Sequence, residues 1–323
     1  MKLVMFGTGD FALPTFHALI EAGHDLRALV TQPDRPQGRK QELIPSPIKL
    51  AAIAAGIPIF QPEQVNAAES LAIIREFAAD LFVTAAYGQI LSAELLGVPP
   101  MGGINLHGSI LPKYRGAAPV ARAIQNGEHE SGVTVIRMTP RIDAGGMIAI
   151  ARTAIDPDET AGELESRIAT LGAPVIVDTI AKLQAGTATI LPQSREKVTR
   201  APKLSKEDGR IDWSRSATVI HNLIRAMNPW PLAETYWHPT EIGCPPVRLI
   251  VHLGAGLASG LGAPGTVVVA DGNRLVVTAG DGAAVGLKTL QVPGKKPMAV
   301  RDFLNGNRVR AGDLFGDEHP LTI

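Results

Sequence analysis

Two polar residues at the end of a short apolar run, and an acid on a later glycine-rich turn, could together support acyl-transfer chemistry. Asn105 and His107 stand two positions apart in the run 103–107. If that run is a strand, both side chains point to the same face of the sheet. Asp143 lies in the segment 141–146, beyond the next expected strand. An amide, an imidazole and a carboxylate brought together can stabilise a tetrahedral intermediate and move its proton.

The same residues also have purely structural explanations. A histidine in an apolar run is commonly a hydrogen-bonded core residue, and an aspartate before glycines commonly forms a turn. Residue types and spacing therefore leave catalysis by Asn105, His107 and Asp143 as one hypothesis and a structural role as the other.

Apolar runs that alternate with helical stretches predict an α/β domain over residues 1–190. The expected strands are 2–6, 26–31, 81–85, 103–107, 132–138 and 146–155, and the helical stretches include 47–56 and 66–78. This alternation indicates a mostly parallel sheet that is covered on both faces. A long helix should follow from Thr160, with Glu163 placed for a capping box. Open sheets of this kind bind ligands at the carboxyl ends of their strands, where Asn105 and His107 fall.

Residues 211–323 contain mostly short β-like runs, and this pattern predicts a small β-barrel. A helix at 214–227 precedes β-like runs at 247–254, 265–270, 274–278 and 283–292, separated by glycine-rich turns. Between the two parts, residues 191–210 form a basic linker that contains Arg195, Lys197, Arg200, Lys203, Lys206 and Arg210. A polyanion could dock there, and a solvated linker is the alternative.

Composition limits the possible classes of protein. The chain has 323 residues, 45% of them hydrophobic, and a formal net charge of zero, which suits a globular chain with one or two cores. The run Leu3–Phe6 is too short for a signal peptide core, and no later stretch has the length of a membrane span, so we expect a cytoplasmic protein. Cys244 is the single cysteine, which excludes an internal disulfide and a thiolate metal cluster within one chain.

The segment Gly7–Ala12 satisfies the G-x-G-x-x-A pattern of dinucleotide-binding turns and lies between an expected strand and helix. A tight strand-to-helix connection in any α/β domain gives the same pattern. Asp10 would also place a carboxylate where a pyrophosphate should bind. These two points argue against nucleotide binding, but the pattern still leaves a nicotinamide-dependent dehydrogenase as the alternative from another class of enzyme.

The run Asn105–Pro119, together with Asp143, resembles the signature of the folate-dependent formyltransferase family. More specifically, the chain is similar to the branch of that family that acts on methionyl-tRNA. The segments with this closer similarity occur in both parts of the chain and are Thr31–Pro36, Pro45–Lys49, Lys203–Glu207, Arg210–Trp213, Asn228–Pro231 and Gly294–Lys296. The resemblance implies a Rossmann-like formyltransferase domain with a mostly parallel sheet, followed by a small OB-like β-barrel domain that binds tRNA.

The resemblance also implies the reaction and its residues. The formyl group of 10-formyltetrahydrofolate would pass to the free amino group of initiator methionyl-tRNA, in a monomer and without a metal. By position, the catalytic residues would be Asn105, His107 and Asp143. The folate-binding residues would be Ser109, Ile110, Leu111 and Pro112, with Tyr87, Gly88, Gln89, Ile90 and Leu91 beside the pterin. The tRNA contacts would be Arg39 and Lys40 in the loop 32–46, with Lys203, Lys206, Lys295 and Lys296.

Two departures from the family pattern stand out. The basic cluster after Gly38 is short, and Gly146 replaces a second acid after Asp143. A formyltransferase for a sugar-nucleotide amine shares the central run, although the segment 45–49 and the paired Lys295 and Lys296 favour tRNA. A formylfolate hydrolase and a non-catalytic RNA-binding adaptor are the remaining alternatives.

Overall fold

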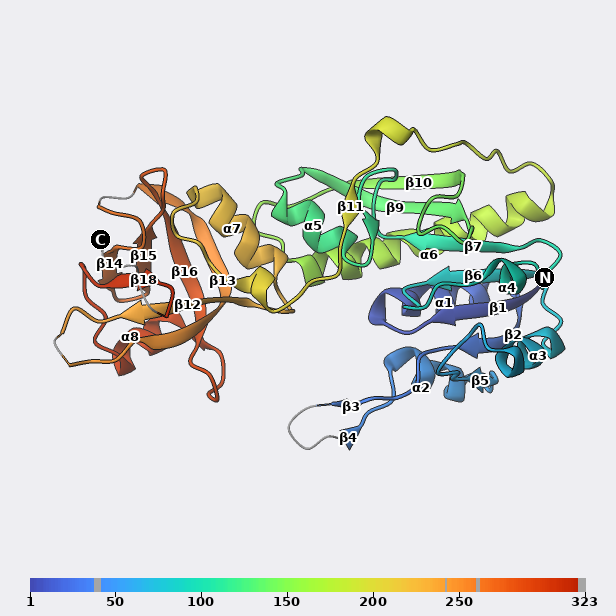
Figure 1. Ribbon diagram of the computed structural model, residues 1–323, viewed down its shortest axis with the longest axis horizontal. Helices are drawn as coiled ribbons and strands as arrows, with labels where there is room; N and C mark the ends of the chain where they lie inside the picture. The colour runs from blue at the N-terminus through green and yellow to red at the C-terminus, as the bar shows by residue number, and fades with distance from the viewer. Residues whose placement is uncertain (38–41, 242, 260–261, 319–323) are drawn as a thin grey trace. The chain divides into compact units, whose positions relative to one another are not determined.

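The computed structural model describes residues 1–37, 42–241, 243–259 and 262–318, and the chain divides into two compact units (Figure 1). The first unit comprises Met1–Pro119, Glu130–Ala154 and Glu165–Pro202. The second comprises Val120–His129, Ile155–Leu164 and Lys203–Ile323. Among the helices of the described residues, none is both long and apolar enough to cross a bilayer.

A seven-stranded sheet forms the centre of the first unit, in the order β10-β9-β7-β6-β1-β2-β5. The strands from β7 to β5 pair in parallel, whereas β9 pairs antiparallel with both β7 and β10. The bounds are β1 (Lys2–Gly7), β2 (Asp25–Val30), β5 (Ile59–Phe60), β6 (Leu81–Ala85), β7 (Gly103–His107), β9 (Glu130–Arg137) and β10 (Met147–Ala154). The prediction of a mostly parallel sheet is confirmed.

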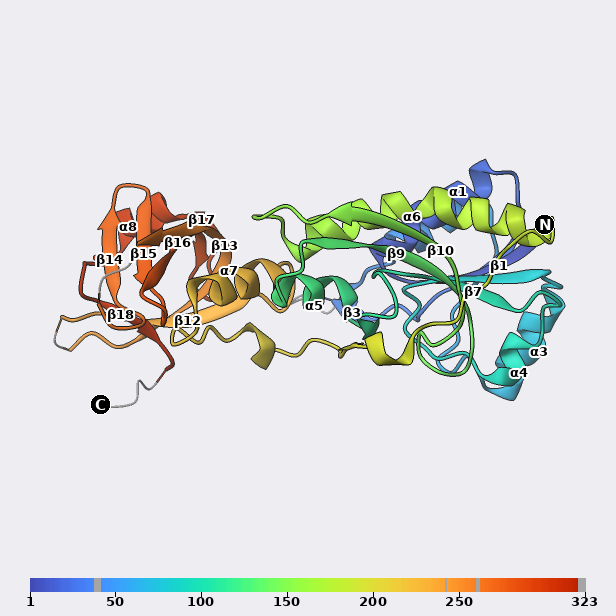
Figure 2. The same ribbon diagram turned by 90° about the horizontal axis from the view of Figure 1, so that it is seen from above.

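Helices cover both faces of this sheet, which explains why its central strands are continuous apolar runs. Every residue of β6 is buried. On one face, Val4 and Phe82 pack against α3 (Ala68–Glu76) and α4 (Ala93–Leu96). On the other lie α1 (Leu13–Glu21) and α6 (Ala161–Gln184) (Figure 2). The helix α2 (Pro47–Ala54) contacts α1, and the short strands β3 (Pro36–Gln37) and β4 (Glu42–Leu43) precede it.

The predicted capping box at the start of α6 is confirmed. The Thr160 hydroxyl accepts a hydrogen bond from the Glu163 backbone N–H at 3.3 Å, and the Glu163 carboxylate accepts one from the Thr160 backbone N–H at 2.8 Å. Hydrogen bonds from Thr160 to the carboxylate lower the pKa of Glu163. Two backbone donors that the helix itself cannot satisfy are thus paired, and the chain direction at the helix start is fixed.

Part of the predicted basic linker lies within the first unit. Leu191 pairs with Met147 of β10, and β11 (Arg200–Ala201) pairs in parallel with β8 (Arg115–Gly116). The chain enters the second unit at Lys203. The segment Leu191–Pro202 is therefore tied to the first unit by backbone pairing, although of its residues only Ala201 is buried, while the domain limits proposed at 190 and 210 stay a prediction.

The second unit is built around an antiparallel, nearly closed barrel, in the order β14-β15-β16-β13-β12-β18. An antiparallel bridge between Thr266 and Leu314 joins the two edges, and β17 pairs with β16. The bounds are β12 (Ala233–His238), β13 (Val247–Ser259), β14 (Val267–Asp271), β15 (Arg274–Thr278), β16 (Ala283–Gln291), β17 (Met298–Ala299) and β18 (Leu314–Gly316), with the helices α5 (Pro119–Gln125), α7 (Ala217–Ala226) and α8 (Val300–Gly306). The prediction of a small OB-like barrel is confirmed.

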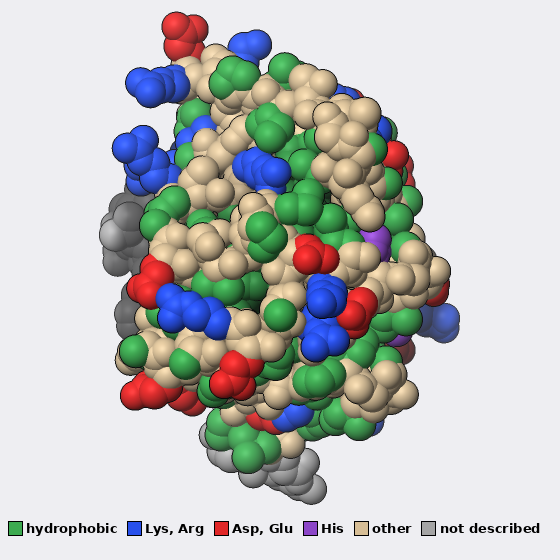
Figure 3. Space-filling view, turned by 90° about the vertical axis from the view of Figure 1, so that its right-hand side faces the viewer, with side chains coloured by type: hydrophobic (Ala, Val, Ile, Leu, Met, Phe, Trp, Pro, Cys, Tyr) green, Lys and Arg blue, Asp and Glu red, His purple; other side chains and the backbone are tan. Residues whose placement is uncertain are grey.

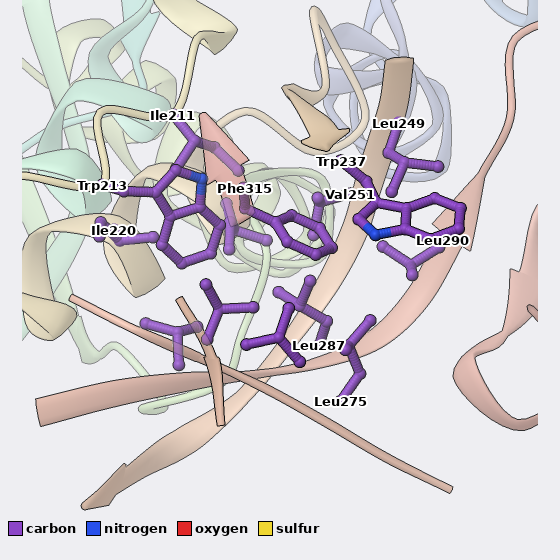
Figure 4. Packing of buried hydrophobic residues seen from close by; sticks show 14 of the residues in the cluster. Ile211, Trp213, Ile220, Trp237, Leu249, Val251, Leu275, Leu287, Leu290 and Phe315 are labelled. Carbon is purple, nitrogen blue, oxygen red and sulfur yellow. The ribbon is translucent and has the colours of Figure 1, made fainter. Parts of the chain in front are cut away.

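Aliphatic side chains together with Trp213, Trp237 and Phe315 fill the interior of the barrel (Figure 4). The Trp213 and Phe315 rings meet edge to face, with their centroids 5.9 Å apart. The Trp213 indole N–H also donates a hydrogen bond to Thr235 Oγ1 at 3.0 Å, so the ring is buried without an unpaired donor. The barrel therefore has a core of its own.

A buried arginine ties α7 to the segment Ile155–Leu164 within the second unit. Arg225 is 7% exposed, and its guanidinium donates to Asn222 Oδ1 at 2.9 Å. It also donates to the backbone oxygens of Asp156 and Glu159, at 3.1 and 3.3 Å. These bonds compensate for the cost of burying the charged group.

Replacing Arg225 by methionine is expected to lower the free energy of unfolding by about 1–3 kcal/mol, because it leaves those acceptors without their donor. Urea unfolding followed by tryptophan fluorescence measures the change. The control is Arg274→Met on an exposed position of β15, which should change stability by less than about 0.5 kcal/mol. Equal stabilities of the two variants would contradict the assigned role of Arg225.

Candidate active site

His107 ends strand β7, and its imidazole lies between a carboxylate and a backbone carbonyl. Its Nδ1 is 3.5 Å from Asp143 Oδ2, and its Nε2 is 2.8 Å from the backbone oxygen of Tyr114. The exposed fractions of the two side chains are 6% for His107 and 13% for Asp143. The structure thus brings together a histidine and an acid that are far apart in the sequence.

The hydrogen-bond network fixes which ring nitrogen of His107 can exchange a proton. A carbonyl oxygen only accepts hydrogen bonds, so Nε2 must carry the hydrogen that it shares with Tyr114. Nδ1 is then the nitrogen that can take up or release a proton, and it faces the Asp143 carboxylate. This geometry is compatible with proton transfer at Nδ1.

The turn that carries Asp143 depends on its glycines. Asp143 itself adopts φ 48°, a left-handed conformation that aspartate tolerates better than most residues. Its Oδ2 accepts a hydrogen bond from the Gly116 N–H at 2.9 Å. A Cβ on Gly145 would overlap the Arg137 carbonyl oxygen, and one on Gly146 would overlap the Ile190 side chain. The close approach of Ile190 gives a steric reason for Gly146 where the family pattern has a second acid.

Asn105 lies in the middle of β7, between Thr84 of β6 and Ile136 of β9. The intervening Leu106 points to the opposite face, where it lies against Gly172 of α6. Asn105 and His107 therefore share the other face. Asn105 is half-buried, and no hydrogen bond joins its side-chain amide to the described part of the chain. Its amide can donate to a bound molecule.

The predicted folate segment 109–112 follows His107 and is held to the sheet by Thr134 of β9. The Thr134 hydroxyl donates to the Ser109 carbonyl oxygen at 2.7 Å and accepts from the Leu111 N–H at 3.1 Å. Ser109 and Leu111 are buried, with exposed fractions of 1% and 2%, whereas Ile110 and Pro112 are half-buried. A ligand at this segment would meet its backbone and the side chains of Ile110 and Pro112.

The predicted pterin-flanking segment 87–91 leaves the carboxyl end of β6 with alternating inward and outward side chains. Tyr87 and Leu91 belong to the buried core, and burial raises the pKa of Tyr87 well above its ordinary value. Gln89 uses its side chain to hold the backbone of Val65, Pro62 and Glu63. Gly88 and Ile90 are exposed. They and the backbone are the parts of this segment that a ligand could contact.

The predicted tRNA contacts divide between described and undescribed residues. Arg39 and Lys40 lie outside the described residues. Lys203, Lys206, Lys295 and Lys296 are exposed in the second unit, and within the described ranges none of these four lysines forms an ion pair. Nor do the described residues contain a group of three or more His, Cys, Asp or Glu that could hold a metal ion.

Sequence reasoning did not assign roles to two residues that hold this site together. Gln193 donates hydrogen bonds to the backbone of the Asp143 turn, and Thr199 Oγ1 accepts from the Tyr114 N–H at 2.8 Å. Both lie in the segment that was predicted to be a linker. No local pattern marks them, because their partners are 48 or more residues away.

Comparison with known protein families identifies the class of protein that has this fold and this site. Residues 1–180 match the family described as Formyl transferase, and residues 203–308 match Formyl transferase, C-terminal domain. A methionyl-tRNA formyltransferase of Moorella thermoacetica is 42% identical over 316 residues, which cover 98% of this chain and 99% of that relative. One of Pseudomonas putida is 42% identical over 318 residues, covering 98% of this chain and all of that relative. The chain belongs to the methionyl-tRNA formyltransferase family.

Solved structures with this fold include more distant proteins. WlaRD, a sugar 3N-formyl transferase crystallised with dTDP and 5-N-formyl-THF, superimposes with a TM-score of 0.66 at 20% identity, covering 92% of this chain and 99% of that chain. HypX from Aquifex aeolicus in complex with tetrahydrofolic acid gives a TM-score of 0.61 at 15% identity, covering 94% of this chain and 46% of its own. These structures support the fold.

Proposed function

We propose that this protein transfers the formyl group of 10-formyltetrahydrofolate to the amino group of methionyl-tRNA. The observation that carries the proposal is full-length similarity to methionyl-tRNA formyltransferases in a chain that places His107 and Asp143 together at the end of β7. The sugar formyltransferase resembles the chain only distantly, at 20% identity. Methionyl-tRNA is therefore a better supported acceptor than an amino sugar.

The site residues would act on the proton and on the developing negative charge. The folate supplies a formyl group activated at N10. As the amine adds to the formyl carbon, a new C–N bond forms and the formyl oxygen gains negative charge. The amide of Asn105 can donate a hydrogen bond to that oxygen, which stabilises it. Asn105 is suited to this role because its amide is not used within the described fold.

His107 and Asp143 would move the amine proton. Nδ1 of His107 accepts it, and the Asp143 carboxylate stabilises the resulting imidazolium across the 3.5 Å separation. The proton then goes to N10 of the folate as the old C–N bond breaks. His107 Nε2 stays bonded to Tyr114, which holds the ring orientation throughout.

A direct assay tests the proposed function. The protein is mixed with 10-formyltetrahydrofolate and methionyl-tRNA, and formylation is detected as loss of the free amino group. A parallel reaction contains an amino-sugar nucleotide in place of the tRNA. Formylation of the tRNA alone is expected. Formylation of the sugar alone, or of neither, would refute the proposal.

We propose that tRNA binds through its phosphates to the exposed lysines of the second unit. Basic side chains on the face of the molecule drawn in Figure 3 are mixed with acidic and apolar ones. Lys203 and Lys206 lie in a solvent-exposed stretch of the second unit, which leads into a short helical turn that carries Glu207 and Asp208. Unpaired lysines contribute to phosphate binding through counterion release.

Affinity for methionyl-tRNA is expected to fall steeply as salt rises, and Lys206→Ala should make the slope of log Kd against log salt shallower by roughly one. Filter binding at several potassium chloride concentrations gives the slope. Lys2→Ala, an exposed lysine of the first unit, is the matched control and should leave the slope unchanged. An affinity that does not depend on ionic strength would refute phosphate binding.

We further propose that the protein works as a monomer in the cytoplasm. Asn105, His107 and Asp143 all come from one chain, so a second copy is not needed to complete the site. The proposed acceptor is a charged tRNA, which places the reaction where translation occurs. Light scattering of the purified protein tests the oligomeric state.

A further inference from the structure

The side chain of Gln193 links the turn that carries Asp143 to the strand end that carries Gly116. Its Nε2 donates to the backbone oxygen of Asp143 at 2.8 Å and to that of Gly145 at 2.7 Å. Its Oε1 accepts two hydrogen bonds from the Arg115 guanidinium, at 3.0 and 2.7 Å. Both ends of one amide are therefore fully used.

This pattern of donors and acceptors requires a glutamine. The carbonyl oxygens of the turn only accept and the guanidinium of Arg115 only donates, so the bridging side chain needs a donor at one end and an acceptor at the other. The same pattern assigns which atom of the Gln193 amide is nitrogen. A positive guanidinium on Oε1 also strengthens the hydrogen bonds that Nε2 donates.

The bonds close a ring around Asp143. Gly116, the residue after Arg115, donates its N–H to the Asp143 carboxylate, while Arg115 holds the Asp143 backbone through Gln193. Asp143 sits in a left-handed conformation on a turn between β9 and β10. Such a conformation persists only where the surroundings determine it. Without Gln193, two of the contacts that hold the turn are lost.

We propose that Gln193 is a positioning residue that fixes the backbone of Asp143, so that its carboxylate stays beside Nδ1 of His107. This proposal rests on the formyl transfer proposed above. Residues that orient a metal ligand through hydrogen bonds commonly affect activity by roughly 10- to 100-fold, and we expect a similar effect where a residue orients a reacting carboxylate. The effect arises because a displacement of about 1 Å at a reacting group can cost on the order of a hundredfold in rate.

Two near-isosteric variants test whether the hydrogen bonds that Gln193 donates to the Asp143 turn matter in addition to its contact with Arg115. Gln193→Glu keeps an acceptor for Arg115 and loses the donor to the Asp143 turn. Gln193→Met loses both. Each is expected to lower kcat roughly 10- to 100-fold, with little change in KM for 10-formyltetrahydrofolate. The pH dependence of kcat should move towards that of Asp143→Asn. Gln184→Glu, an exposed glutamine at the end of α6, is the matched control and should behave as the wild type.

A double variant and a spectroscopic measurement decide the outcome. Adding Gln193→Glu to Asp143→Asn should cause little further loss, because both changes disrupt the same pair. Nitrogen NMR of the His107 imidazole, titrated with pH, should differ between Gln193→Glu and the wild type. An unchanged His107 titration, or losses that multiply in the double variant, would overturn the proposal. An inactive wild type would count against the proposed function alone, and the titration would still decide the role of Gln193.

Discussion

Replacing His107 by alanine is expected to lower kcat for formylation by roughly 10²- to 10⁴-fold, the usual contribution of a positioned acid or base. The imidazole is the group that would take the amine proton, and the alanine side chain has no group that could replace it. Binding of methionyl-tRNA should be retained, since the proposed phosphate contacts lie in the second unit. Single-turnover formylation, with tRNA binding measured separately, distinguishes the two effects.

An exposed histidine of the first unit provides the control for this prediction. His17 lies on the solvent side of α1, so His17→Ala should leave turnover unchanged. Urea unfolding of both variants shows whether a fall in rate reflects lost structure. A folded His107→Ala protein with wild-type turnover would remove His107 from the mechanism.

Replacing Gly116 by alanine is expected to lower both stability and activity. Gly116 has φ +129°, and a Cβ there would overlap the Ala201 carbonyl oxygen of β11. Overpacking against backbone commonly costs about 1–3 kcal/mol. The displaced Gly116 N–H would also no longer hold the Asp143 carboxylate, so kcat should fall by roughly 10-fold or more.

Urea unfolding and steady-state kinetics measure the two effects of Gly116→Ala. Gly9→Ala is the comparison, because Gly9 has φ −81° and a Cβ there meets no atom within 4 Å. That variant should change stability by less than about 0.5 kcal/mol. If Gly116→Ala were as stable and as active as Gly9→Ala, the pairing of β8 with β11 would not matter to the site.

The strands that hold the site could be predicted from the sequence because they are buried on both faces. The strands β6 and β7 have the predicted bounds, since a continuous apolar run between polar turns leaves little freedom in where a strand ends. The strand β12 was not predicted. It alternates buried and half-buried residues, contains Glu234 and follows a proline-rich segment, and its pairing with β13 and β18 depends on residues far along the chain.

The site was predictable to a similar, partial degree. The pattern around Asn105 and His107 indicates the carboxyl end of a strand. The glycine-rich turn around Asp143 indicates where an acid can approach that strand end. Position in the sequence does not reveal that the Tyr87 ring packs on Phe6 in the core, at a centroid separation of 5.4 Å, and the role of Tyr87 beside the pterin stays a prediction. Gln193 shows the other limit, since a single glutamine in a basic stretch gives no sign of the turn that it holds 50 residues away.

The chain passes more than once between its two units, and this has a consequence for dissecting the protein into pieces. Arg122 pairs with Asp208 at 2.7 Å, and Arg225 holds the backbone of Asp156 and Glu159. A fragment that begins at Lys203 would contain Asp208 and Arg225 but would lack their partners Arg122, Asp156 and Glu159. A fragment that stops at residue 190 would lack Gln193, Thr199 and β11. We therefore expect neither fragment to be as stable as the corresponding unit of the full chain.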